Sequence, residues 1–197
     1  MPHVDYKDYP SVTRVKDILA KPFLYGWYAK LGWTKCEKIK KESQDIGLEV
    51  HETIEQRLLN KSVTTKSPQV LELVDAVFTS FIDLNKPQIV WLEKHLISEK
   101  HKTHGTCDGC FIIGEDYVLL DWKTSSRLNK TDEIQLAGYL VCLEETDPEL
   151  AAKVNTGLIV NVNKDTKKVL LQTVRNLHAY KGYFLDCLEL YNEYGKC

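Results

Sequence analysis

The sequence predicts a mixed α+β fold, with a helical N-terminal part over residues 1–86 and a sheet-centred core over residues 87–197. Two patterns carry this prediction. In the first part, apolar side chains recur at intervals of three and four, as on one face of a helix. In the second, short runs rich in Ile, Val, Leu and aromatic residues are separated by turn residues, as in strands. With 43% hydrophobic and 27% charged residues, the chain is expected to form a single domain over residues 1–197.

Three helices are expected in the N-terminal part. The first begins after a Ser11 cap and ends near Gly32, and a lysine-rich connection leads to the second. Ser67 and Pro68 suit the cap and first position of the third helix, which ends at Asn85-Lys86-Pro87. The apolar positions of the first two helices are Val12, Val15, Ile18 and Leu19, then Ile46, Val50, Ile54 and Leu58.

The core is expected to follow the order β-β-β-α-β-β-α. Its strands are predicted at residues 88–98, 105–113, 116–123, 156–163 and 167–174, and its helices at about 131–145 and 176–194. This order is typical of a mixed sheet flanked by helices.

Charge and hydropathy limit the classes of function. The net charge of −2 argues against a protein that coats nucleic acid through overall positive charge, so that any phosphate-binding surface must be local. No apolar run approaches the roughly 18 residues of a membrane span. The N-terminus has neither the apolar region of a signal peptide nor the Arg-rich character of a transit peptide. We therefore expect a cytoplasmic protein without a membrane partner.

The six cysteines are scattered, which in a cytoplasmic setting favours free thiols over a disulfide framework. His101, His104, Cys107 and Cys110 follow one another at three-residue spacing, and these residue types suit zinc. In an extended strand, however, residues three apart lie on opposite faces, so the four side chains do not converge on one ion. We expect no structural zinc, and a zinc-stapled interaction domain remains the alternative that metal analysis would reveal.

The triplet Asp-x-Lys occurs three times, beginning at Asp5, Asp121 and Asp165. The first lies in a polar N-terminus and the third in a turn between strands. Only the second follows a strongly apolar run, Tyr117-Val-Leu-Leu120, which can hold a carboxylate and an ammonium group rigidly. Because side chains alternate along a strand, Asp121 and Lys123 are expected on the same face.

Asp108 is expected to lie directly opposite Asp121. If Gly114-Glu115 is a two-residue hairpin turn with glycine first, as a type II′ turn prefers, the numbers of paired residues sum to 229. Opposed side chains share a face, with Cβ atoms about 4.5–5.5 Å apart. Two carboxylates at that distance repel unless a cation lies between them, and oxygen ligands suit Mg²⁺ or Mn²⁺. Two unrelated surface aspartates would account for neither the shared face nor the lysine.

Further motifs occur in order along the chain. They are Tyr9-Pro-Ser-Val-Thr-Arg-Val15, Gly47-Leu-Glu-Val-His51, Gly105-Thr-Cys-Asp-Gly109, Leu119-Leu-Asp-Trp-Lys-Thr-Ser125 and Gln135-Leu-Ala-Gly-Tyr139. The last four resemble the RecB-type branch of the PD-(D/E)XK nucleases. The opening motif resembles the mitochondrial genome maintenance exonuclease family and its bacterial and phage relatives. The similarity covers roughly residues 9–145, and it implies a restriction-endonuclease-like core sheet in a bacterial cell or a phage-infected host.

The resemblance implies a role for each matching residue. Asp108 and Asp121 would bind Mg²⁺ or Mn²⁺, joined by His51 and the backbone carbonyl of Trp122. Lys123 would position the attacking water or stabilise the transition state. The remaining implied residues are the catalytic Gln135 and Tyr139, and Glu93, with Glu99 as a weaker choice, as a ligand or a support for the ligands. Without the motifs, His51 would be interpreted as a hydrogen-bonded interface histidine.

Some relatives carry an iron–sulfur cluster held by one upstream and three clustered C-terminal cysteines. Cys187 and Cys197 lack that clustering, so we expect no such cluster. The predicted activity is hydrolysis of DNA, with single-stranded DNA bearing a free end as the partner. A structure-specific endonuclease and a non-catalytic nucleic-acid-binding module remain alternatives.

A local surface is expected to bind the nucleic acid. Its predicted residues are Arg14, Lys35, Lys38, Lys40, Lys41, Ser125 and Ser126. For the lysine run, a solvated loop is an equally good interpretation. Trp27, Trp33 and Trp91 are interpreted as packing residues rather than as base-stacking platforms.

Overall fold

The computed structural model describes residues 6–19 and 23–195, and Cys197 therefore lies outside the described residues. The N-terminal elements are α1 (Val12–Lys16), α2 (Phe23–Leu31), α3 (Trp33–Leu58), α4 (Pro68–Val77), the π-helical turn η1 (Phe78–Ile82) and α5 (Asp83–Asn85). The core elements are β1 (Gln88–Ser98), β2 (Thr103–Ile113), β3 (Asp116–Lys123), α6 (Thr131–Thr146), α7 (Pro148–Lys153), β4 (Val154–Val162), β5 (Val169–Arg175), the 3₁₀ turn η2 (Leu177–Tyr180) and α8 (Lys181–Tyr194).

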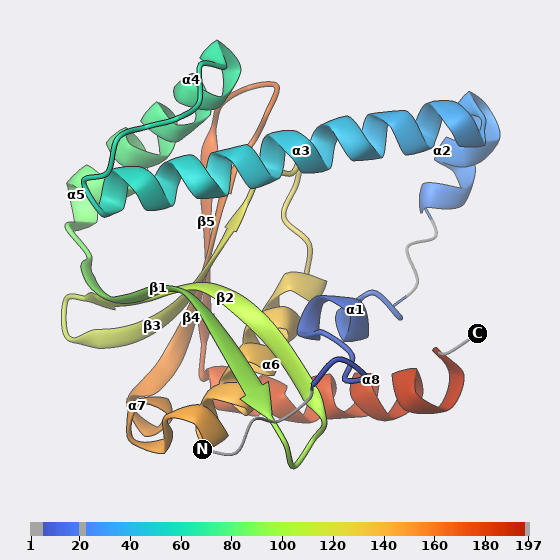
Figure 1. Cartoon of the computed structure of the whole chain (residues 1–197), viewed down its shortest axis with the longest axis vertical. Helices are drawn as coiled ribbons and strands as arrows, with labels where there is room; N and C mark the ends of the chain where they lie inside the picture. Colours follow the sequence, from blue (N-terminus) through green and yellow to red (C-terminus); the bar gives the residue numbers. More distant parts are fainter. Residues whose placement is uncertain (1–5, 20–22, 196–197) are drawn as a thin grey trace.

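Within the described residues, the strands form a single five-stranded sheet in the order β1-β2-β3-β4-β5. Neighbouring strands are antiparallel except β3 and β4, which are parallel and are connected through α6 and α7. Figure 1 shows α3 and α4 on one side of this sheet and α6 and α8 on the other. The mixed α+β class and the helical N-terminal part are confirmed, and the arrangement is consistent with a restriction-endonuclease-like fold.

Each face of the sheet buries its own apolar cluster. Alternate residues of β3 divide between the clusters: Leu119 packs with α1, α6 and α8, whereas Val118, Leu120 and Trp122 pack with α3 and α4. This two-residue alternation follows from the pleat of a strand covered on both faces. It also fixes the direction of the residues that follow at the end of β3.

The β2–β3 hairpin follows the predicted register. Ile113 pairs with Asp116 and Gly109 with Leu120, so the residue numbers of each pair sum to 229. Gly114 has φ 65°, the left-handed conformation that the first central position of a type II′ turn requires. The strands predicted at 88–98 and 116–123 are confirmed, and the others differ by one or two residues at their ends.

Two predictions for the N-terminal part were wrong. The first helix does not continue to Gly32, because α1 ends at Lys16 and Asp17 caps it. Pro22 in the sequence is also incompatible with the interior of one helix through this region. The lysine-rich segment is not a connection, because it forms the first turns of α3.

The helical state of the lysine-rich segment has a local explanation. Lysine and glutamate are good helix formers and need no apolar stripe to favour a helix. Ion pairs one turn apart add to this preference, at 3.8 Å between Lys38 and Glu42 and at 3.0 Å between Lys40 and Glu37. The third predicted helix has its Ser67 cap and ends before Pro87, although its last turns are η1 and α5. Among the described residues, no helix has both the length and the apolar character needed to cross a bilayer.

Candidate active site

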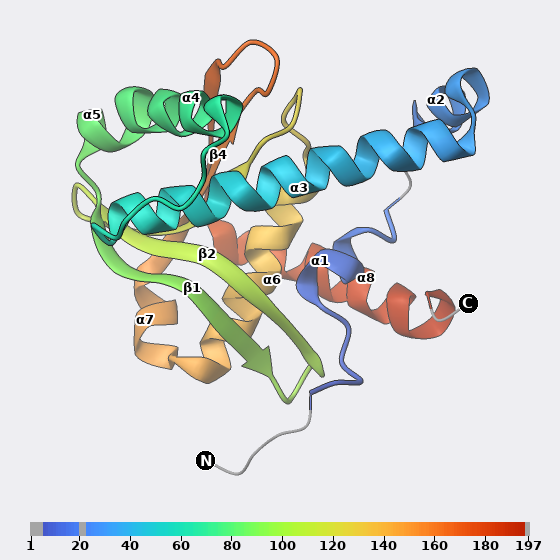
Figure 2. The ribbon, with the colours of Figure 1, turned by 45° about the horizontal axis from the view of Figure 1, so that its top comes forward.

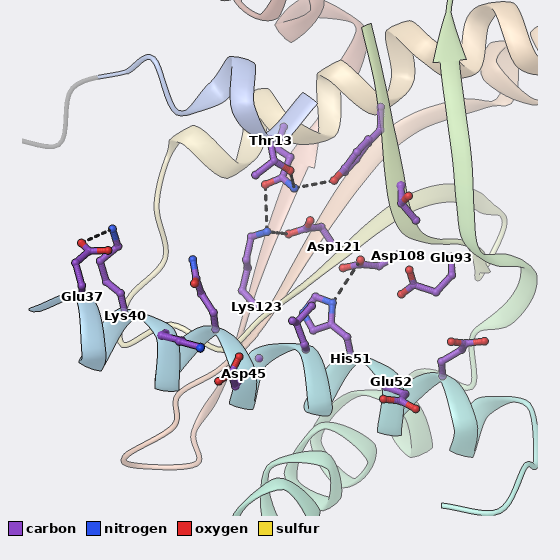
Figure 3. Close-up of a pocket in the computed structure, with 18 residues that line it drawn as sticks. Thr13, Glu37, Lys40, Asp45, His51, Glu52, Glu93, Asp108, Asp121 and Lys123 are labelled. Carbon is purple, nitrogen blue, oxygen red and sulfur yellow. Dashed lines mark hydrogen bonds and ion pairs between the residues drawn. The ribbon is translucent and has the colours of Figure 1, made fainter. Parts of the chain in front are cut away.

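The residues predicted to be catalytic, together with His51 and Glu93, line a cleft of about 1350 Å³ between α3 and the end of the sheet, shown in Figure 3. α1, α3, the strands β1 to β3 and α6 all contribute to its walls. The lining residues are Thr13, Glu37, Lys40, Lys41, Gln44, Asp45, Gly47, Leu48, His51, Glu52, Glu55, Glu93, Thr106, Asp108, Asp121, Lys123, Gln135 and Tyr139.

β3 delivers Asp121 and Lys123 to the cleft from the same face. The Lys123 ammonium lies 2.6 Å from Asp121 Oδ2, and the Asp121 side chain is 2% exposed. Beyond this ion pair, the buried oxygen has no further hydrogen-bond partner among the described residues. A buried carboxylate oxygen in this state retains the capacity to accept a further ligand.

β2 delivers Asp108 at the point where the β2–β3 ladder stops. The last paired residues are Gly109 and Leu120, one step before the two aspartates. Beyond them, the Asp108 side chain takes the place of a main-chain acceptor, since the Trp122 N–H donates to its Oδ2 at 2.6 Å. Its Oδ1 lies 3.5 Å from His51 Nδ1 on α3. Asp108 therefore links the sheet to the helix that covers the cleft.

Glu93 lies on the other side of Asp108. It falls between the pairs Leu92–Gly109 and Lys94–Cys107, which places it opposite Asp108 across the β1–β2 ladder. Its φ of 46° is a left-handed conformation, which costs a residue with a Cβ atom roughly 1–3 kcal/mol. Strain of this kind persists where the surrounding structure enforces it, and it is most common at functional sites.

Three of these side chains form a group suited to a metal ion. Ligand atoms of His51, Glu93 and Asp108 all lie within 4.8 Å of one another. Asp121 is not part of this group, and its carboxylate is instead paired with Lys123. Trp122 packs its indole ring between Phe81 and Phe111, with only its backbone near the acids.

A hydrogen-bonded network supports Lys123. Its ammonium donates to Gln135 Oε1 at 3.1 Å, and the Lys16 ammonium donates to the same oxygen at 2.8 Å. The Gln135 amide nitrogen donates to the Tyr139 hydroxyl at 2.8 Å and to Thr13 at 3.4 Å. Because its oxygen accepts from two ammonium groups, the Gln135 amide is held in one orientation.

Lys16 and Asp132 were missed by the sequence prediction. Both are buried, and their charged groups lie 3.0 Å apart. A signal for Lys16 was present, since it follows Val12 and Val15 at the spacing of the buried face of α1. A lysine at a core position requires a buried partner, although the sequence does not say which acid supplies it.

Close packing around Gly105 explains why its motif begins with glycine. A Cβ atom there would lie 2.8 Å from the Tyr139 ring and 3.2 Å from Val12. Glycine at this position therefore lets Tyr139 and α1 approach β2 closely, which brings Gln135 to the cleft.

Burial and charge separate the pKa values of the acids. Burial, together with the charge of Asp108, raises the pKa of Asp121 to about 6, although Lys123 opposes this shift. Burial and the charge of Asp108 likewise raise the pKa of Glu93 to about 7. Burial also disfavours the charged form of Asp108, but His51, Lys123 and the Trp122 N–H outweigh it and lower its pKa.

The two basic groups are shifted toward their charged forms. For His51, the attraction of Asp108 outweighs burial and raises the pKa. For Lys123, Asp121 and Asp108 outweigh burial and raise the pKa in the same way. Without a bound cation, protonation therefore reduces the negative charge of the acids in the cleft, and pairing with His51 and Lys123 offsets the remainder.

The residues predicted to bind nucleic acid are only partly brought together. Lys40 and Lys41 line the cleft, whereas Lys35 and Lys38 lie further along α3. The Arg14 guanidinium lies 5.5 Å from the centre of the Tyr191 ring. The Ser125 hydroxyl hydrogen-bonds with Asn161 and donates to the Arg127 carbonyl, and Ser126 is exposed. Ser125 thus has a structural role in this loop.

The spaced histidines and cysteines lie apart from the cleft. His101 is in the turn before β2, while Cys107 and Cys110 are buried in the core. The His104 ring lies 5.1 Å from those of both Tyr6 and His95.

No family model and no curated protein sequence matches this chain. Among solved structures, it is similar to SSO0001, with a TM-score of 0.42 and 13% identity over 96% of this chain and 79% of that one. It is also similar to the alkaline exonuclease LHK-Exo from Laribacter hongkongensis, with a TM-score of 0.43 and 14% identity over 95% and 91%. The same exonuclease in complex with dAMP gives 0.43 and 15% over the same shares. Similarity of this degree carries no functional assignment, which must rest on the site.

Proposed function

We propose that this protein is a Mg²⁺- or Mn²⁺-dependent nuclease that hydrolyses phosphodiester bonds in DNA. The observation that carries the proposal is the position of Asp108. It lies between Glu93 and Asp121 on three neighbouring strands, with His51 and Lys123 at the two ends of the row. Asp108 and Asp121 are both buried, and two buried carboxylates on neighbouring strands are costly unless a cation joins them. A cation at this place, next to the exposed Glu93, can meet a phosphate.

The donor atoms fit a divalent cation. His51, Glu93 and Asp108 offer one nitrogen and carboxylate oxygens within reach of a common centre. The buried carboxylate of Asp121, which is ion-paired with Lys123, lies on the neighbouring strand. The backbone carbonyl oxygen of Trp122 is a further metal ligand. The N–H and C=O groups of a strand residue point toward the same neighbouring strand, and the Trp122 N–H points to Asp108 on β2. Oxygen donors favour Mg²⁺ or Mn²⁺, and the histidine nitrogen is the donor that Mn²⁺ accepts more readily.

When bound, the ion would offset charge on the scissile phosphate and make water a better nucleophile. Among the residues of this chain, Lys123 would assist the same reaction. Its ammonium, held between Asp121 and Gln135, can orient a water or meet charge that develops on the phosphate. Tyr139 keeps the Gln135 amide turned so that its oxygen faces Lys123.

The depth of the acids supports single-stranded DNA as the substrate. Asp108 and Asp121 are 8% and 2% exposed, and α3 forms the wall of the cleft that faces them, as Figure 3 shows. A single strand can bend to bring one phosphate under a helix. A duplex, with a persistence length of about 50 nm, would have to be strongly deformed or unpaired to do so.

Cleavage of labelled strands tests this function. Purified protein is incubated with 5′- or 3′-labelled linear single strands and with circular single strands, each with EDTA, Mg²⁺ or Mn²⁺. We expect metal-dependent digestion of the linear strands only, which is the behaviour of an exonuclease. Digestion of the circle would assign an endonuclease, and binding without cleavage under every metal condition would contradict the proposed activity.

A further inference from the structure

A second feature lies at the end of α3 remote from the sheet, where α2 folds back on it. Figures 1 and 2 show α2 and the start of α3 projecting away from the body of the molecule. Trp33, the first residue of α3, is 71% exposed. The sequence-based interpretation of Trp33 as a packing residue was therefore wrong, although Trp27 and Trp91 are partly buried.

The Trp33 ring is held in place despite its exposure. It stacks on Tyr28, with ring centroids 4.9 Å apart and an angle of 28° between the planes. Tyr28 is fixed in turn, because its hydroxyl donates to Glu37 and accepts from the Lys40 ammonium at 3.3 Å. Lys40 also donates to Glu37 at 3.0 Å, which closes a triangle of hydrogen bonds. The result is a rigid aromatic surface, here called the Trp33 platform, made of Trp33 and Tyr28.

The platform lies in the most basic stretch of α2 and α3. Between Lys30 and Lys41 the sequence has five lysines and one glutamate, a local charge of +4 in a chain of net charge −2. Lys30, Lys35 and Lys38 are exposed. An exposed aromatic ring among lysines is the combination that binds single-stranded nucleic acid, because bases stack on the ring and phosphates pair with the ammonium groups.

Lys40 connects the platform to the cleft. It bonds Tyr28, lines the cleft of the acids, and also lines a second cavity of about 480 Å³. Within the described residues that line these two cavities, Lys40 is common to both. The second cavity carries Trp27 from α2, the hydroxyl-bearing Ser126 and the Lys164 ammonium. Aromatic, hydroxyl and basic groups of the second cavity thus meet the cleft of the acids at Lys40, beside the platform.

We propose that the Trp33 platform is a second nucleic-acid subsite, on which a base of a single strand stacks while its phosphates follow Lys40 into the cleft. Along α3, Trp33 and His51 are 18 residues apart, or about 27 Å, so a strand must be several nucleotides long to reach both. The inference rests on the proposed nuclease function for the identity of the strand. It predicts that loss of the Trp33 ring weakens the binding of long strands and does not change the binding of short ones.

Binding is measured first, without turnover. In an Asp121→Asn background with Mn²⁺, fluorescence anisotropy follows labelled oligothymidines of about 4 and about 20 nucleotides. Trp33→Ala should weaken binding of the longer strand about ten-fold, the loss of one stacked base, and leave the shorter one unchanged. Trp33→Phe should restore most of the affinity because it retains a ring. The matched control is Tyr183→Ala on α8, an aromatic residue that is 60% exposed and packs against Tyr180.

The lysines are tested by salt. Lys35→Gln with Lys38→Gln should make the affinity for the longer strand fall less steeply with salt concentration, because fewer counterions are released. Lys100→Gln with Lys102→Gln, an exposed pair in the turn between β1 and β2, should leave the slope unchanged. Equal affinities of wild type and Trp33→Ala for the longer strand would overturn the subsite.

The outcome is independent of catalysis. Suppose that Trp33→Ala weakens binding of the longer strand, but the wild-type protein never cleaves that strand. The proposed function then fails and the subsite stands. If the protein cleaves both strands and Trp33→Ala binds and cleaves the longer one like wild type, the function stands and the subsite is wrong.

Discussion

The two ends of the cleft differ in the balance of their charged groups. The Lys123 end consists of Asp121, Lys123, Gln135, Lys16 and Asp132. Its two carboxylates face two ammonium groups at 2.6 and 3.0 Å, so the buried charges balance. Breaking such a buried pair costs several kcal/mol, because one charge is then left without compensation. This end is therefore complete as the chain folds.

The His51 end consists of His51, Glu93 and Asp108, and it is not balanced. Two carboxylates face one imidazole, and Glu52 and Glu55 from α3 also line this side of the cleft. The pKa of Glu93 is raised to about 7, and its backbone is in the left-handed region. Interactions that reduce stability are retained where function requires them.

The comparison indicates how the two ends divide the chemistry. One end contains a positioned ammonium group, and under the proposed function the donor atoms of the other end bind a cation. A cation that binds only the folded protein would then add stability that grows with the logarithm of its concentration, once this exceeds the dissociation constant. Substitutions at either end should therefore have different effects on cleavage, stability and metal affinity.

Asp121→Asn should have the largest effect, a loss of cleavage rate of at least about a thousand-fold. The amide keeps the shape of the carboxylate but removes the charge that attracts both Lys123 and a cation. The measurement is the initial rate on a labelled single strand with saturating Mn²⁺. Asp116→Asn, an exposed change on the same strand, is the control. A variant at Asp121 that cleaves at the wild-type rate would remove this residue from the site.

Lys16→Met should destabilise the fold by about 3–5 kcal/mol, because it leaves Asp132 buried without its partner. Urea unfolding measures the loss, with the exposed Lys130→Met as control. Adding Asp132→Leu should recover most of the stability, since a buried pair can be replaced by apolar residues. If Lys16→Met unfolds like wild type, the balance at the Lys123 end is not what holds α1 against α6.

His51→Asn should weaken the affinity for Mn²⁺ by about 10–100-fold, by removing one donor from the group on the unbalanced end. Calorimetric titration of the metal measures this affinity directly, without substrate. His95→Asn is the control, because this histidine pairs with Thr106 outside the group. An unchanged titration would exclude His51 as a ligand.

The strands and the placement of Asp108 beside Asp121 could be predicted from the sequence, because both depend on local rules, whereas Glu93 was expected only from the family resemblance. Gly114 fixes the turn, the turn fixes the register, and the pleat fixes the faces of Asp121 and Lys123. The length of α3 was not predicted, because its lysine-rich turns have no apolar period. The Lys16–Asp132 pair joins residues 116 positions apart, and the strain at Glu93 is imposed by neighbouring strands, so neither is encoded locally.

Metal affinity should also rise with pH, by about ten-fold between pH 6 and 7. A cation requires deprotonated ligands, and the pKa values of Asp121 and Glu93 are raised to about 6 and about 7. The raised pKa of His51 acts in the same direction, since protonated imidazole cannot bind a metal. Titrations of Mn²⁺ at about pH 5.5, 6.5 and 8 measure the trend. A flat profile would mean that the acids of the cleft are not the ligands.

Glu93→Gln should have the smallest effect and the opposite sign, since it should stabilise the metal-free protein. The folded-state pKa of about 7 exceeds the ordinary pKa of 4.5 for a glutamate, so ionised Glu93 destabilises the fold. That cost is absent below about pH 4.5, grows up to about pH 7 and is constant above it. A shift of this size in a fully desolvated group would correspond to roughly 3 kcal/mol, but Glu93 is partly exposed and we expect about 1 kcal/mol. Urea unfolding with EDTA at about pH 8 and about pH 4.5 should therefore show a gain only at the higher pH, and a gain at both would point to relief of strain rather than of charge.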